Sequence, residues 1–250
     1  MEKMPVTDYS VIADRYDKNP VRQKEIDYQI KDLMNQNKSL KILDLACGTG
    51  NYLKTQTDYY KSYNINWYGM DKSPEMLAAA EKKNPEVNFI CSSMENLDEN
   101  LKSFDYIRNE FAFHHFTDKK LAAEKIYRML KPGGLFIMKN ICPEYINDSW
   151  VYHYFPGTAE IDKKRFMPPN KIFKLFRATG FDTIINIDST LQLLDYKIAF
   201  DEALNRDMSQ LNLITEKEYK SGIRKMKKDM EEGVTRISDF ALLECRCTKK

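Results

Sequence analysis

The chain has few cysteines, few histidines and no strong excess of charge of either sign. Its five cysteines form no CxxC pair and no even disulfide framework, which predicts a reduced, cytoplasmic protein. Lysine and arginine number 39 against 37 aspartates and glutamates, so the net charge of +2 argues against a nucleic-acid partner. No apolar run approaches the ~20 residues of a membrane span, and the N-terminus lacks an apolar signal core. These absences predict a soluble globular protein without a membrane partner. They give no prediction of the oligomeric state.

Apolar runs alternate with amphipathic stretches along most of the 250 residues. The runs predict strands at 41–45, 65–70, 87–91, 104–108, 135–139, 181–188 and 237–247. Helices are predicted over 21–34, from 51, from 74 with Ser73 as N-cap, after Thr117 as N-cap, and over 170–179, with Ile172, Phe173 and Phe176 inward. Alternating strands and helices predict an α/β fold with a mostly parallel sheet.

Two stretches depart from this alternation. Periodicity is lost over 141–169, where aromatic residues are frequent, and these either form flat walls for a small organic substrate or pack as a lid. Residues 191–233 predict two or three amphipathic helices. We expect one domain over 1–250, with helices at 1–38 and insertions at 141–169 and 191–235 on the substrate side.

The stretch KILDLACGTGNYL, residues 41–53, combines a buried strand, a small-residue turn and a helix start. Gly48 and Gly50 let backbone approach a ligand, and the helix start attracts anionic groups. The third glycine of a dinucleotide fingerprint is replaced by Leu53, and no P-loop lysine follows, which counts against NAD, FAD and ATP. Asp71 ends the second strand, where a carboxylate can accept hydrogen bonds from both hydroxyls of a ribose.

Four ordered blocks, LDLACGTG, YGMDKSPEML, FDYIRNEFAFHHF and LKPGG, closely resemble the class I S-adenosylmethionine-dependent methyltransferases of small-molecule type. The similarity runs from Val11 to about Asn140 and resumes in the last two strands. The resemblance implies S-adenosyl-L-methionine as cofactor. It also implies a Rossmann-like seven-stranded sheet of order 3-2-1-4-5-7-6 with strand 7 antiparallel, N-terminal helices, and a helical cap inserted between strands 6 and 7.

The resemblance also implies roles for individual residues along the cofactor. Asp44 would contact the methionine amino group, orient the glycine turn, or do both. Asp71 would hold the ribose. The remaining implied contacts are backbone at Ala46, Gly48, Gly50 and Asn109, and the adenine side at Lys72, Met76, Ser93 and Met94. Tyr16 and Arg22 would close an N-terminal lid over the methionine end, with plain packing as the alternative for Tyr16.

The chain has three histidines, His114, His115 and His153, each near the predicted carboxyl-end rim of the sheet. A histidine there has a pKa suited to a general base, and His114 is the first candidate. The alternative is a structural or pocket-shaping role. No carboxylate or cysteine accompanies the three histidines at ligand-like spacing, so no metal site is predicted.

These features predict a methyltransferase that acts on an O, N or C nucleophile of a small molecule. Two other functions remain open. One is a methyltransferase of the same fold that acts on RNA or protein, which the near-neutral charge disfavours. The other is a protein that binds the cofactor without transferring a methyl group.

Overall fold

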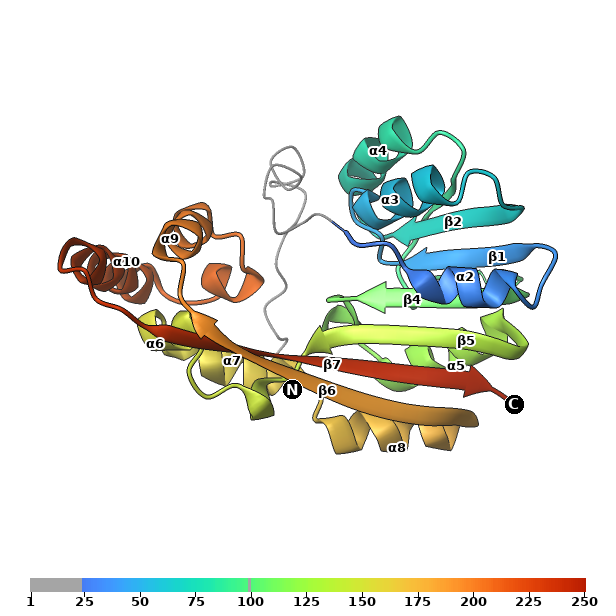
Figure 1. The fold of residues 1–250 in the computed structure, drawn as a ribbon. Helices are drawn as coiled ribbons and strands as arrows, with labels where there is room; N and C mark the ends of the chain where they lie inside the picture. The colour runs from blue at the N-terminus through green and yellow to red at the C-terminus, as the bar shows by residue number, and fades with distance from the viewer. Residues whose placement is uncertain (1–23, 99) are drawn as a thin grey trace. The chain divides into compact units, whose positions relative to one another are not determined.

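A computed structural model describes residues 24–98 and 100–250 (Figure 1). Its centre is one seven-stranded sheet of order β3-β2-β1-β4-β5-β7-β6, and β7 runs antiparallel to its neighbours. The strands are β1 (Leu40–Leu45), β2 (Ile65–Asp71), β3 (Asn88–Cys91), β4 (Phe104–Glu110), β5 (Leu130–Ile141), β6 (Phe181–Leu193) and β7 (Ile237–Lys249). This confirms the predicted fold class, strand order and orientation.

Helices connect the strands. They are α2 (Tyr28–Met34), α3 (Asn51–Tyr59), α4 (Pro74–Lys83), α5 (Lys119–Met129), α6 (Trp150–Tyr154), α7 (Gly157–Arg165), α8 (Pro169–Thr179), α9 (Tyr196–Asn205) and α10 (Glu216–Glu231). Short 3₁₀ turns are η3 (Phe113–His115), η4 (Pro143–Tyr145) and η5 (Ser209–Asn212). None of the helices in the described ranges is both long and apolar enough to span a membrane.

Two compact units divide the described residues. The sheet unit consists of 24–98, 100–139, 172–185 and 244–250, and the helical unit consists of 140–171 and 186–243. The core of the sheet unit is built from apolar residues of β1, β2 and β4 with side chains from α2 and α3, among them Ile42, Leu53 and Tyr106. The helical unit has a core of its own, formed by α6, α9, η5 and α10.

Local signals placed several elements correctly. Ser73 is the N-cap of α4, because its hydroxyl accepts a hydrogen bond from the amide of Met76 at 3.2 Å. Pro74 occupies the first turn of α4, and Met76, Leu77 and Ala80 are its buried residues. Cys245 and Cys247 are both buried on β7.

Several predicted boundaries and caps are wrong. Asp118, not Thr117, caps α5, because its carboxylate accepts the amide of Leu121 at 2.9 Å. Strand β5 begins at Leu130 rather than at 135, since Leu130 pairs with Phe104 and a register shift absorbs the intervening residues.

Other corrections concern longer segments. The described part of the predicted 21–34 helix is helical only over α2. Strand β4 extends to Glu110 and β6 to Leu193, beyond their predicted ends. Residues 141–169 include two short helices, α6 and α7. Phe173 is 42% exposed rather than inward, whereas Ile172 and Phe176 are buried.

Candidate functional site

The turn after β1 has an unusual backbone. Ala46, Gly48 and Gly50 all have positive φ, of 64°, 54° and 75°. A Cβ at Gly48 would meet no atom of the described residues within 4 Å, so this glycine faces open space. A Cβ at Gly50 would lie 2.7 Å from Nδ2 of Asn84, so this glycine packs against the end of α4. The two glycines therefore have different roles, one toward open space and one toward the fold.

Asp71, at the end of β2, is fixed by two backbone amides. Its Oδ2 accepts a hydrogen bond from the amide of Gly48 at 2.9 Å, and its Oδ1 accepts one from the amide of Ser73 at 3.0 Å. Each carboxylate oxygen can accept more than one hydrogen bond, so both oxygens retain capacity for a ligand. The carboxylate links the β1 turn to the start of α4 and is held in a single orientation.

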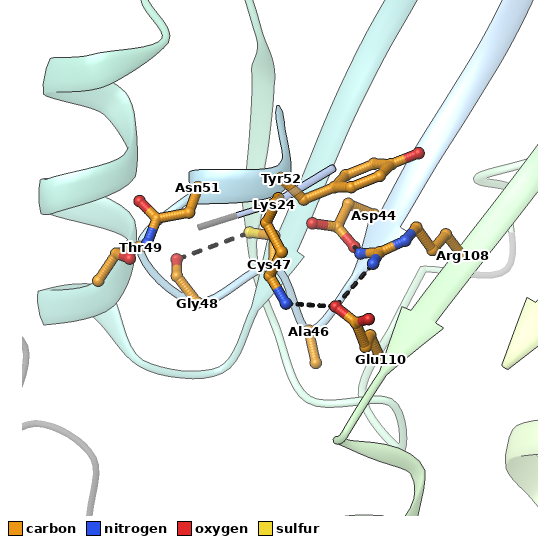
Figure 2. A pocket seen from close by; sticks show the side chains of 10 residues that line it. All are labelled: Lys24, Asp44, Ala46, Cys47, Gly48, Thr49, Asn51, Tyr52, Arg108 and Glu110. Atoms are coloured by element: carbon orange, nitrogen blue, oxygen red, sulfur yellow. Dashed lines mark hydrogen bonds and ion pairs between the residues drawn. The ribbon is translucent and has the colours of Figure 1, made fainter. Parts of the chain in front are cut away.

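A pocket lies beside this turn, within the sheet unit (Figure 2). Three of the predicted site residues, Asp44, Ala46 and Gly48, line it. The other lining residues are Lys24, Cys47, Thr49, Asn51, Tyr52, Arg108 and Glu110. The pocket therefore combines the glycine turn with charged side chains from β1, β4 and the chain before α2.

Arg108 is the central charge of the pocket. Asp44 on β1 is the register partner of Arg108 on β4, which brings the Asp44 carboxylate to 3.5 Å from Nη1. Nη2 of Arg108 donates to Oε2 of Glu110 at 2.7 Å. The guanidinium carbon lies 3.7 Å from the centre of the Tyr52 ring. Arg108, only 9% exposed, is thus held by two carboxylates and an aromatic face.

The Tyr52 side chain is held in place by a hydrogen bond of its hydroxyl group. Its hydroxyl donates to Oδ2 of Asp27 at 2.7 Å, and the hydroxyl of Tyr106 donates to the same oxygen at 2.8 Å. Asp27 is the N-cap of α2, because its carboxylate also accepts the amide of Gln29. The start of α2 is therefore tied to α3 and β4 next to the charged pocket.

The two carboxylates beside Arg108 differ in acidity. Burial raises the pKa of Asp44 to about 6, against the opposing effect of Arg108. Burial also disfavours ionisation of Glu110, but Arg108 and Lys24 outweigh it and bring that pKa down to about 2. Glu110 is consequently ionised across the physiological range, whereas Asp44 titrates near its lower end.

Lys24, Tyr52, Arg108 and Glu110 line the pocket but are not among the site residues predicted from the sequence. A signal for Arg108 was present, because an arginine inside the apolar strand YIRNE needs a buried partner. Asp44 is the one carboxylate of the neighbouring apolar run. Glu110 follows Arg108 by two residues and so shares its face of the strand. For Lys24 the sequence held no comparable signal.

The remaining predicted contacts lie in several environments. Lys72 is exposed, whereas Met76 and Met94 are buried, each about 3% exposed. The Ser93 hydroxyl accepts the amide of Asn96 at 3.3 Å. Asn109 is fully buried, and its side-chain amide donates to the carbonyl of Leu45 at 2.7 Å, which ties β4 to the end of β1. Their roles toward a cofactor stay predictions.

The three histidines are divided between the two units. His114 and His115 lie together in η3 of the sheet unit, with ring centres 3.9 Å apart. His153 lies in α6 of the helical unit, and its Nε2 is 2.9 Å from Nζ of Lys225. Burial, Arg236 and Lys225 lower the pKa of His153. The lowered pKa favours the neutral imidazole of His153, whose Nε2 lies next to the Lys225 ammonium.

Two further predictions concern the lid and the aromatic stretch. Tyr16 and Arg22 lie outside the described residues. Trp150, Tyr154 and Phe155 are buried in the core of the helical unit, so packing accounts for these three aromatic side chains. A substrate-facing role is not needed to explain them.

Comparison with known proteins identifies the relatives of this chain. A family model described as a methyltransferase domain matches residues 42–134. A demethylmenaquinone methyltransferase of Thermotoga maritima is 30% identical over 166 residues, which cover 57% of this chain and 70% of the relative. A demethylmenaquinone methyltransferase of Chlorobaculum tepidum is 28% identical over 164 residues, which cover 56% of this chain and 65% of the relative. The chain thus spans about two thirds of the length of these curated relatives.

Among solved structures, a putative methyltransferase from an antibiotic biosynthesis pathway of Anabaena variabilis shares the fold, with a TM-score of 0.66 at 19% identity. The match covers 87% of this chain and 96% of the other. The strand order, the glycine turn and the identity to the Thermotoga relative all indicate the same family. The chain belongs to the class I S-adenosylmethionine-dependent methyltransferases.

Proposed function

We propose that the protein transfers the methyl group of S-adenosylmethionine to a nucleophilic atom of a small organic molecule. One observation carries the proposal. The Asp71 carboxylate at the end of β2 is hydrogen-bonded to the amide of Gly48, in the turn at the end of β1. This arrangement holds an acceptor for ribose hydroxyls beside bare backbone at the carboxyl ends of two adjacent parallel strands.

The residues present fit such a nucleoside. The open space over Gly48 admits close approach of a ligand, because no Cβ stands there. Asp71 retains lone pairs on both oxygens for the two ribose hydroxyls. The pocket next to the turn carries two carboxylates and two cations, which suits an amino-acid end with one charge of each sign.

The cofactor, when bound, supplies a methyl group made electrophilic by a sulfonium centre. The residues of the chain bind and orient: Asp71 would hold the ribose and the turn after β1 would support the chain between ribose and amino acid. His114 stays the candidate base that takes a proton from the acceptor. Placement in line and exclusion of water supply the remaining acceleration.

The acceptor is proposed from the relatives. Two of them are named demethylmenaquinone methyltransferases, so demethylmenaquinone is the first acceptor to test. The net charge of +2 favours a small molecule over RNA. Cofactor binding without transfer is the remaining alternative, and only a product assay separates it.

Isothermal titration with S-adenosylhomocysteine tests cofactor binding. Wild type is expected to bind, and Asp71→Asn to lose roughly 1–3 kcal/mol of binding free energy, because a charged acceptor becomes a neutral amide. Asp239→Asn is the matched control, since Asp239 also accepts two backbone amides, of Asn147 and Asp148. Absence of binding by wild type at millimolar ligand would refute the proposal.

Transfer of a labelled methyl group tests the reaction. A reduced demethylmenaquinone analogue and a panel of phenols, amines and small RNAs are the acceptors. His114→Gln is expected to lower turnover and to leave the affinity for S-adenosylhomocysteine unchanged. Full turnover in that variant would remove His114 as the base, and binding without any methylated product would favour the alternative.

A further inference from the structure

Glu110 and Lys24 form an ion pair that lines the pocket. Nζ of Lys24 contacts Oε2 of Glu110, and both side chains line the pocket (Figure 2). The Glu110 side chain is 16% exposed and that of Lys24 is 25% exposed. The pair therefore presents one anion and one cation side by side to the same space.

The geometry leaves half of the Glu110 carboxylate open. Arg108 and Lys24 both contact Oε2. Within residues 24–98 and 100–250, no donor forms a hydrogen bond to Oε1. Arg108 in turn is fixed by Asp44 and by the face of Tyr52, so the carboxylate that it holds keeps one position. Glu110 is thus an oriented, ionised acceptor with one oxygen that no donor of the described residues uses.

The charge of the pocket selects the kind of ligand. Among residues 24–98 and 100–250, its ionisable side chains are the two cations Lys24 and Arg108, the carboxylates Asp44 and Glu110, and the un-ionised side chains of Cys47 and Tyr52. With both carboxylates ionised the four charges cancel, so a bare cation or a bare anion would leave a net charge in a largely buried space. A zwitterion, with one ammonium and one carboxylate on the same carbon, leaves none.

We propose that Glu110 and Lys24 together bind the amino-acid end of the cofactor, with the α-ammonium on Glu110 and the α-carboxylate on Lys24. This inference rests on the proposed function, because it concerns the same ligand. The ligand's ammonium then lies against the Glu110 carboxylate, and the ligand's carboxylate lies against the Lys24 ammonium. Arg108 is a positioning residue, since it holds Glu110 rather than the ligand.

The assignment predicts that the pocket distinguishes adenosine ligands with an amino-acid end from adenosine ligands without one. A ligand with adenosine and a thioether but no amino acid gains nothing from Glu110 or Lys24. Asp44 is a weaker candidate for the ammonium, because it is 3% exposed and its carboxylate faces Arg108. Glu110 and Lys24 are therefore expected to determine how strongly the protein prefers an amino-acid nucleoside.

The experiment compares two ligands by isothermal titration at pH 7.5. S-adenosylhomocysteine has the amino-acid end, and 5′-methylthioadenosine lacks it. Wild type is expected to bind S-adenosylhomocysteine at least about tenfold more tightly, since charge-assisted hydrogen bonds at both ends contribute. Glu110→Gln and Lys24→Met are each expected to reduce this ratio at least about fivefold, with the affinity for 5′-methylthioadenosine unchanged.

Glu244→Gln is the matched control, because Glu244 on β7 pairs with Lys139 at 3.4 Å outside the pocket. It should keep the wild-type ratio. A wild-type ratio in either pocket variant would overturn the proposal, as would an equal loss of both ligands in Glu110→Gln. Equal binding of the two ligands by wild type would overturn it while leaving the proposed function intact. Binding of neither ligand by wild type would instead refute the proposed function.

Discussion

At the scale of single residues, Ala46 holds a conformation that favours glycine. Its φ is 64°, whereas the neighbouring Gly48 has a similar φ of 54° without a Cβ. A left-handed backbone costs roughly 1–2 kcal/mol for a residue with a Cβ. We therefore expect Ala46→Gly to raise the free energy of unfolding by about 0.5–1 kcal/mol, after the extra entropy of glycine in the unfolded chain. Urea denaturation measures the change.

Gly48→Ala is the mirror control at the same turn. A Cβ at Gly48 meets no described atom within 4 Å, so only the backbone conformation opposes the change. The free energy of unfolding should fall by about 1 kcal/mol. If both variants shift stability in the same direction, the strain assigned to Ala46 is wrong.

Asp44 gives the pocket a pH dependence. The groups that act on it are Arg108, Glu110, Lys24 and Asp71, and burial dominates them, so its pKa is about 6. A bound ammonium nearby favours the ionised form, and binding below pH 6 must therefore release a proton. The affinity for S-adenosylhomocysteine is expected to rise several-fold from pH 5 to pH 7. Glu110 stays ionised throughout, because its pKa is about 2.

Titration calorimetry at pH 5, 6 and 7 measures this rise. The ligand's own α-amino group stays protonated over most of this range, because such groups have pKa values of about 7.7–8.0. Asp44→Asn removes the titrating group and should give a flat profile. A profile of wild-type slope in that variant would assign the pH dependence to another group.

At the scale of elements, the cap of α5 provides a test within two adjacent residues. Asp118 accepts the amide of Leu121, whereas Thr117 precedes the helix. Loss of an N-cap side chain costs about 0.5–2 kcal/mol. Asp118→Ala should therefore lower the free energy of unfolding by about 1 kcal/mol, and Thr117→Ala should change it little. Equal losses in the two variants would contradict the assigned cap.

The elements that the sequence predicted well carry strong local signals. Buried apolar runs marked β1 and β2, and a serine before a proline marked α4. The poorly predicted elements depend on contacts distant in sequence. Helix α6 has five residues and is stabilised by the core it forms with α9 and α10, so its periodicity is too short to detect.

The candidate site shows the same division. Asp44, Gly48 and Asp71 could be proposed because the two short blocks LDLACGTG and YGMDKSPEML mark them. Arg108 and Glu110 enter the pocket through the register of β4 against β1, which pairs Arg108 with Asp44. Lys24 enters through its contact with Glu110, 86 residues away. Such contacts are properties of the folded chain, and single-sequence patterns do not contain them.

At the scale of the whole molecule, ligand binding should appear as stabilisation. All ten described residues that line the pocket belong to the sheet unit. Saturation at 100 times the dissociation constant adds about 2.7 kcal/mol. For a protein of this size, that raises the melting temperature by roughly 5–10 °C. If calorimetry resolves two transitions, the shift is expected in the one that unfolds the sheet unit.

Two variants test which unit is responsible for the rise in melting temperature on ligand binding. Glu110→Gln should show a smaller shift than wild type at the same concentration of S-adenosylhomocysteine, because its affinity is lower. His153→Gln should keep the full shift, since His153 lies in the helical unit and contacts Lys225 there. A reduced shift in His153→Gln would mean that the helical unit contributes to cofactor binding, and the cofactor site would then have to be extended beyond the pocket beside β1 and β4.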